Sequence, residues 1–189
     1  MTSMNKIAKF TLMSYIVGTL FFNPIAKADG GNVCVPLSIQ KQGWFKRYVQ
    51  GVHDINYSMK LLRNKKAKKA LEKIRSINVP DSLDYGEENK EDLKKARSIV
   101  EYTIALCFEA MGEPDSAIYH CKRSVQANGG LSDISGNSYL LIAKGYEKMG
   151  DYDSAILYAD SALESFRKGY EKGIPQAQKF KEKILKKKK

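Results

Sequence analysis

Two eight-residue stretches decide the fold: residues 111–118 read MGEPDSAI and residues 149–156 read MGDYDSAI. They agree at six of eight positions and lie 38 residues apart. The agreement extends outward, since Ala105 and Phe108 correspond to Ala143 and Tyr146 at the same offset. Self-similarity at a fixed period is typical of proteins built by stacking one supersecondary unit on the next. The sequence therefore predicts a repeat protein.

Each copy has the periodicity of two helices joined by a tight turn. Apolar and small residues recur at three- and four-residue spacing on both sides of the Met-Gly pair. Gly112 and Gly150 suit a helix C-terminus, where the backbone turns left-handed. Asp115 and Asp153 are expected to satisfy free N–H groups at the start of the following helix. In the first copy the periodic residues are Ile104, Ala105, Phe108 and Met111, then Ala117, Cys121, Ser124 and Val125.

These units resemble tetratricopeptide repeats. The family pattern has aromatic and apolar residues in the first helix, glycine at the turn and alanine twice in the second helix. The earlier unit departs from it at Glu101, where the family has an aromatic residue, and at Ser124, where it has alanine. The family's closing proline is absent from both units. The later unit matches through Tyr139, Ile142, Ala143, Tyr146, Gly150, Tyr152, Ala155 and Ala162.

The resemblance covers roughly residues 98–169 and implies an all-α fold, an α-α superhelix of helix-turn-helix repeats. We expect a degenerate helical repeat over 44–80, repeats over 93–131 and 136–169, and a capping helix with a basic tail over 174–189. The acidic, turn-rich stretch 81–92 is expected to be a loop. In the capping helix, Ala177, Phe180 and Ile184 should face inward and the lysines outward.

The first 28 residues have the organisation of a secretory signal peptide. Lys6 and Lys9 precede the uncharged apolar run 10–22, and Ala26-Lys27-Ala28 offers a cleavage site. An uncleaved N-terminal anchor is the alternative. We expect an exported protein, periplasmic or secreted, whose mature chain begins near Asp29 with an irregular lead-in over 29–43.

The chain is strongly basic. Its formal charge is +11, and loss of the three lysines in residues 1–28 leaves +8. The excess gathers in Lys65-Lys66, in Lys68-Lys69 and in the tail 186–189. Such runs could contact nucleic acid, acidic lipid or an acidic protein. Solvated helix ends explain them more simply, and no nucleic-acid partner is expected.

No catalytic or metal-binding pattern is present in the sequence. The two histidines are far apart, no C-x-x-C spacing occurs, and Gly129-Gly130 lacks the residues that follow a phosphate-binding loop. We therefore expect a protein that is not an enzyme and needs no cofactor or metal. Cys107 and Cys121 fall on helices expected to be neighbours, so they either form a disulfide or serve as small core residues.

By the resemblance, the first helices of successive units line a groove that binds a protein or peptide, as in a scaffold or adaptor. Apolar groove residues suit an amphipathic helical ligand. Packing of the same side chains inside the short array is the alternative. A second hypothesis is a structural or membrane-peripheral protein, in which Lys186–Lys189 and the Phe180/Ile184 face dock on anionic lipid. The expected groove residues are Ile99, Tyr102, Leu106 and Glu109 in the earlier unit and Asn137, Leu140, Lys144 and Glu147 in the later one.

Overall fold

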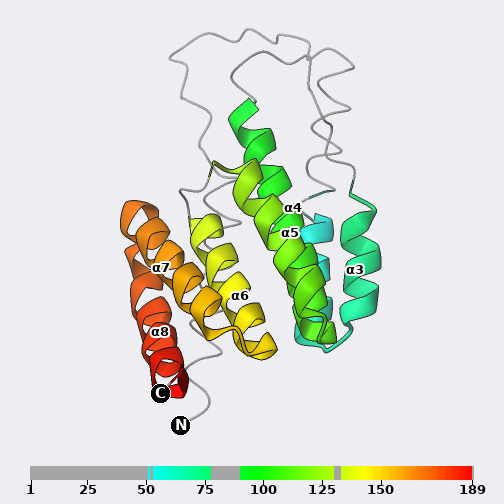
Figure 1. Cartoon of the computed structure of the whole chain (residues 1–189). Helices are drawn as coiled ribbons and strands as arrows, with labels where there is room; N and C mark the ends of the chain where they lie inside the picture. Colours follow the sequence, from blue (N-terminus) through cyan, green and yellow to red (C-terminus); the bar gives the residue numbers. More distant parts are fainter. Residues whose placement is uncertain (1–50, 52, 78–89, 130–132, 189) are drawn as a thin grey trace, which may run out of the picture. The chain divides into compact units, whose positions relative to one another are not determined.

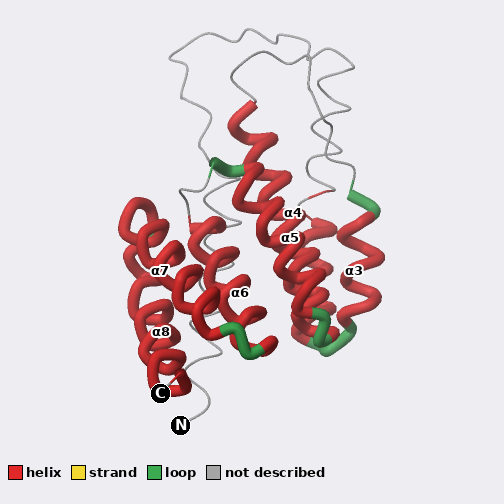
Figure 2. The backbone as a smooth tube through the Cα atoms, viewed as in Figure 1, coloured by secondary structure: helices red, strands yellow, loops and turns green. Residues whose placement is uncertain are grey.

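Helices that follow one another along the chain also pack against one another (Figure 1). The computed structural model describes residues 51, 53–77, 90–129 and 133–188, and within them the chain is helical with no strand (Figure 2). The expected signal peptide (1–28), the lead-in (29–43), Cys34 and the start of the degenerate repeat lie outside the described residues. The all-α fold of stacked helix-turn-helix units is confirmed.

The described helices form antiparallel pairs within one unit that begins at His53. A helical segment at 53–63 is joined to α3 by a tight turn and by an ion pair between Asp54 and Lys73. Farther along the chain, α4 pairs with α5 and α6 pairs with α7, while α8 packs on α7. The 3₁₀ helix η2 (Glu171–Gly173) leads into α8. The helix bounds are α3 (Ala67–Arg75), α4 (Lys90–Met111), α5 (Pro114–Ala127), α6 (Asp133–Met149), α7 (Tyr152–Gly169) and α8 (Ile174–Lys188).

The start of α4 corrects one sequence expectation. Residues 90–92 belong to the helix, although 81–92 was expected to be a loop. The acidic, turn-rich composition of 81–92 marks a loop, but it does not locate the residue at which the following helix starts.

The turns at Gly112 and Gly150 have the same backbone geometry. Both glycines are left-handed, with φ of 81° and 82°. In each turn the glycine N–H and the next N–H donate back to carbonyls of the preceding helix in the crossed pattern of a Schellman motif. The bonds are Gly112 to Glu109 (3.1 Å) and Glu113 to Phe108 (3.0 Å), then Gly150 to Glu147 (3.1 Å) and Asp151 to Tyr146 (3.0 Å).

The turn between 53–63 and α3 repeats this geometry with a lysine in place of glycine. Lys65 has a φ of 58°. Its N–H donates to the Leu62 carbonyl at 3.0 Å, and the Lys66 N–H donates to the Leu61 carbonyl at 2.9 Å. A side chain makes the left-handed conformation cost about 1 kcal/mol, so glycine is the usual residue at such a position. Because this turn has lysine there, a search of the sequence for glycine does not find it.

An alanine follows each turn residue five positions later and lies where the two helices approach. Ala70, Ala117 and Ala155 are buried, and each donates its N–H to the carbonyl at the start of its helix. A residue without a bulky side chain lets the paired helices come close together at this level. The three units therefore share one turn and one contact, even though the first diverges most in sequence.

The capping aspartate of α7 is Asp151, which corrects the expectation for Asp153. Asp151 Oδ1 accepts the Ser154 N–H at 3.0 Å, and hydrogen bonds from Ser154 lower the pKa of this carboxyl. Asp153 lies in the first turn and pairs with Lys188. Asp115 likewise lies in the first turn of α5, whose N-cap Glu113 makes no side-chain cap bond.

The shared turn predicts opposite effects of two exchanges. Lys65→Gly should raise the free energy of unfolding by about 1 kcal/mol, because glycine adopts the left-handed conformation without steric cost. Gly112→Lys should lower it by about the same amount. A Cβ at Gly112 meets nothing within 4 Å, so backbone conformation alone sets that cost. Urea unfolding checks both, and a destabilising Lys65→Gly would contradict the shared geometry.

Candidate functional site

Two of the eight expected groove residues lie in the core. Ile99 is 6% exposed and Leu140 is 2% exposed. Leu140 packs in a cluster with Ala159, Phe166 and Ala177, drawn from α7 and α8. A ligand cannot reach these side chains without displacing a helix, so they serve the packing of the array.

Tyr102 and Leu106 form the apolar part of the face between α4 and α6. Both are partly buried and pack on a cluster that includes Cys121 of α5 and Ile142 of α6. Burial, together with nearby groups such as Cys121 and Glu109, raises the pKa of the Tyr102 phenol, which therefore stays neutral. Because part of each side chain reaches solvent, they can contact a ligand.

Glu109 and Glu147 occupy equivalent places and link each first helix to the next. Glu109 of α4 pairs with Lys148 of α6 at 3.4 Å. Glu147 of α6 pairs with Lys183 and Lys187 of α8 at 2.8 and 2.6 Å. The ion pairs thus recur along the array, and α8 takes the place that the first helix of a further unit would occupy.

The surroundings of Glu147 favour its charged form. Its side chain is only 13% exposed. Burial alone would raise its pKa, but hydrogen bonds from Lys183 and Lys187 outweigh burial and lower the pKa below the usual 4.5. This carboxylate is engaged within the fold, and it is less open to a ligand than a groove position requires.

Asn137 and Lys144 complete the expected set. The Asn137 side-chain amide donates to the Asp133 carbonyl at 2.8 Å, within the first turns of α6. Lys144 is partly buried and has an interaction of its own. Of the eight expected groove residues, five remain candidates for ligand contact because each is only partly buried and is not engaged as Glu147 is: Tyr102, Leu106, Glu109, Asn137 and Lys144.

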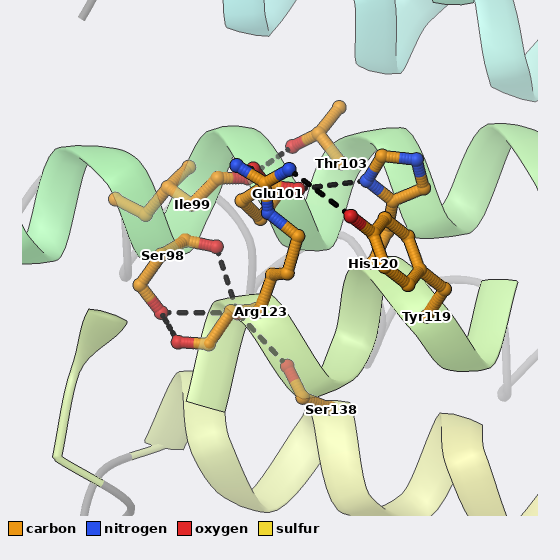
Figure 3. A network of polar contacts seen from close by, with 9 residues as sticks. Ser98, Ile99, Glu101, Thr103, Tyr119, His120, Arg123 and Ser138 are labelled. Carbon is orange, nitrogen blue, oxygen red and sulfur yellow. Dashed lines mark hydrogen bonds and ion pairs between the residues drawn. The ribbon is translucent and has the colours of Figure 1, made fainter. Parts of the chain in front are cut away.

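Three buried serines join α4, α5 and α6, an arrangement the sequence did not predict (Figure 3). Ser98 Oγ donates to the Ser124 carbonyl at 2.9 Å, and Ser124 Oγ donates to the Ser98 carbonyl at 2.8 Å. Ser138 Oγ donates to Ser124 Oγ at 3.1 Å. The Ser124 carbonyl belongs to the last turn of α5, where helical partners run out, so Ser98 caps a neighbouring helix.

Ser124 and Glu101 are the two positions at which the earlier unit departs from the family pattern. Glu101, like Ser124, joins α4 to α5. Its carboxylate contacts His120 Nδ1 at 2.7 Å and Arg123 at 2.9 Å (Figure 3). The equivalent residues in the later unit, Tyr139 and Tyr158, form a ring contact with centroids 6.3 Å apart. A polar pair thus replaces an aromatic pair at the same inter-helix contact.

The adjoining ring contacts confirm that equivalence. Phe108 stacks on His120 with centroids 5.3 Å apart and planes at 11°. Tyr146 stacks on Tyr158 at 5.4 Å and 12°. Comparing the two units at an offset of 38 would have shown that positions 101 and 120 change together, which is the signal in the sequence for this cluster.

In the structure Cys107 and Cys121 are both buried, and both thiols are free. Cys121 packs between α5 and α6. Cys107 lies near Arg75 of α3, whose positive charge partly offsets the effect of burial on the pKa of its thiol. Burial raises the pKa of Cys107 to about 11 and also raises that of Cys121. Protonated thiols are poor nucleophiles, so neither cysteine is activated for chemistry.

The C-terminal helix does not present the apolar face that the lipid hypothesis requires. Phe180 and Ile184 are buried against α7 together with Ala177, which matches a capping helix and corrects the membrane role of this face. Lys181 pairs with Asp160 at 2.6 Å, and Lys188 pairs with Asp153. Much of the charge of α8 therefore serves its attachment to α6 and α7.

Within the described residues, no three His, Cys, Asp or Glu side chains gather closely enough to hold a metal ion. None of the helices in that part of the chain combines the length and apolar character needed to cross a bilayer. No protein-family model matches the sequence, and a search of curated proteins finds no match.

The Glu147 contacts predict a pH-dependent attachment of α8. A lowered pKa stabilises the fold above the usual glutamate value, and that stabilisation is lost as the pH falls through the lowered pKa. Glu147→Gln should therefore cost about 1 kcal/mol at neutral pH. The wild-type and variant stabilities should converge below pH 4.5. Urea unfolding across pH tests this, with Glu182→Gln on the exposed side of α8 as control; parallel curves for Glu147→Gln and wild type would contradict it.

The serine network predicts non-additive substitutions. Ser124→Ala should cost about 1–2 kcal/mol, because it leaves the buried Ser138 hydroxyl without its acceptor and removes the second hydrogen bond that the Ser98 carbonyl accepts beside its helical one. Replacing all three serines with alanine should cost less than the sum of the single changes, since unpaired groups are removed together. Alanine fits the position sterically, as Ala162 does in the later unit. Strictly additive unfolding free energies would count against the network.

Proposed function

We propose that this protein is an exported, non-enzymatic interaction module of the tetratricopeptide-repeat type. It binds a protein or peptide across its first helices and acts as a scaffold or adaptor. The proposed export rests on the organisation of residues 1–28, and the proposed family rests on the matching units.

The observation that carries the proposal is the partly exposed face shared by α4 and α6. Tyr102 and Leu106 offer apolar area packed on a buried cluster, and the resemblance places the polar side chains of Asn137 and Lys144 on the same face. An amphipathic helix recognises such a face by burying its apolar stripe and orienting its charges. Because Ile99 and Leu140 are buried and Glu147 is engaged by α8, the contact area is smaller than the family pattern alone implies.

Site-specific photo-crosslinking tests this assignment in the full-length chain. A photoreactive amino acid at Lys144 should give a discrete crosslinked partner, because the position lies on the proposed face. The same amino acid at Leu157, which is 64% exposed on α7, is the matched control. Lys144→Glu should weaken the isolated partner's binding by about tenfold or more, and Arg167→Glu on α7 should not.

Circular dichroism should show unchanged helicity for each variant, so that loss of binding is not caused by unfolding. Crosslinking from Leu157 alone, or equal loss from Arg167→Glu, would overturn the assignment of the binding face. Leu140 is unsuitable as a test position, because a charge there would be buried and would unfold the array.

A further inference from the structure

A dense group of positive charges lies at the turn between helix 53–63 and α3. Residues 60–69, called the basic tip below, contain six basic residues and no acidic one. All six are exposed. They are Lys60, Arg63, Lys65, Lys66, Lys68 and Lys69.

The neighbouring sequence does not balance this charge. No acidic residue occurs between Ile55 and Leu71. Asp54, just before that interval, is buried and pairs with Lys73 of α3 at 3.0 Å. Glu72, just after it, is exposed and supplies one negative charge against the six positive ones. Arg63 has an interaction of its own, so the argument rests on the five lysines. In contrast, several lysines of α8 meet carboxylates of α6 and α7.

The conformation of Lys65 indicates that the tip has a role other than folding. The residue occupies the left-handed position at which the other two turns have glycine. A lysine there lowers the stability of the fold relative to glycine. Because its side chain is exposed, packing contacts do not compensate for this loss. What the position gains from lysine is a positive charge on an exposed turn.

The chemistry of the tip fits a diffuse anionic surface. Five of its six basic residues are lysines, which act as hydrated point charges, whereas arginine is the residue suited to bidentate recognition of individual phosphates or carboxylates. No aromatic residue lies between Met59 and Leu83, so the tip lacks interleaved rings on which nucleic-acid bases stack. Clustered lysines without a recognition pocket are attracted to the headgroup layer of anionic membranes.

We propose that the basic tip docks this protein on anionic phospholipid bilayers. The contact is electrostatic and peripheral, and it involves the N-terminal end of the described array instead of α8. The α4–α6 face lies on other helices, so lipid docking and partner binding are separate functions of the chain.

Vesicle co-sedimentation of the full-length chain tests the proposal. Vesicles of phosphatidylcholine with about one-third phosphatidylglycerol are compared with pure phosphatidylcholine, which accounts for binding by the apolar run 10–22. K65Q/K66Q/K68Q/K69Q should lower the phosphatidylglycerol-dependent affinity by at least about tenfold, since each lysine near the surface contributes about fivefold. Raising the salt from about 0.1 to 0.5 M should abolish that component.

The tail variant K186Q/K187Q/K188Q/K189Q removes the same number of charges and is the matched control, with an expected loss of less than about threefold. Equal losses from both variants would overturn the proposal in favour of a general charge effect. Unchanged binding by the tip variant would also overturn it, as would tip-dependent binding to duplex DNA that is tighter than binding to vesicles. Thermal unfolding confirms that each variant is folded.

Lys65→Gly separates lipid docking from stability. This exchange should stabilise the fold yet weaken phosphatidylglycerol-dependent binding by about fivefold. Lys144→Glu should leave vesicle binding unchanged, so failure of the lipid proposal and failure of the partner-binding proposal can be told apart. Undiminished vesicle binding by Lys65→Gly, or loss of it in Lys144→Glu, would contradict the assignment.

Discussion

The array depends on a backbone constraint at its turns. One residue in each turn is left-handed, and its N–H and the next one donate back to the preceding helix. This reverses the chain over two or three residues and sets the register of the following helix. The alanine five positions later, at 70, 117 and 155, then always meets the paired helix. Packing within each unit follows from that register.

The two clear units keep the geometry of their inter-helix contacts while changing the chemistry. Glu101 and His120 form a polar pair where Tyr139 and Tyr158 form a ring contact. Ser124 joins a hydrogen-bonded network where Ala162 is an apolar contact. Each exchange preserves partners for the buried groups, which explains why departures from a repeat pattern can leave the fold intact.

The fold could be predicted from the sequence because its signals are local. The period of 38, the Met-Gly turns and the helical spacing are all short-range patterns. The Lys65 turn was not recognisable as such, because the glycine that marks a left-handed residue is replaced. Likewise, Asp151 and Asp153 cannot be distinguished as the cap before the helix start is known to the residue.

The candidate site was less predictable, since accessibility depends on elements far apart in the chain. The family pattern places Leu140 and Glu147 on the binding face, but α7 and α8 cover one and α8 lysines engage the other. Lys183 and Lys187 are separated from Glu147 by about 40 residues of chain. Helical periodicity reports only short-range spacing, so it does not predict these ion pairs. The sequence pattern alone predicts only that the lysines of this helix face outward.

Because the short array buries part of its own face, the proposed partner-binding surface is limited in area and is centred on α4 and α6. Hydrogen–deuterium exchange of the full-length chain, measured with and without its crosslinked partner, tests this account most directly. It predicts slower amide exchange in α4 and α6 on binding, with exchange in α5 and α7 unchanged. Protection confined to α5 and α7 would contradict it.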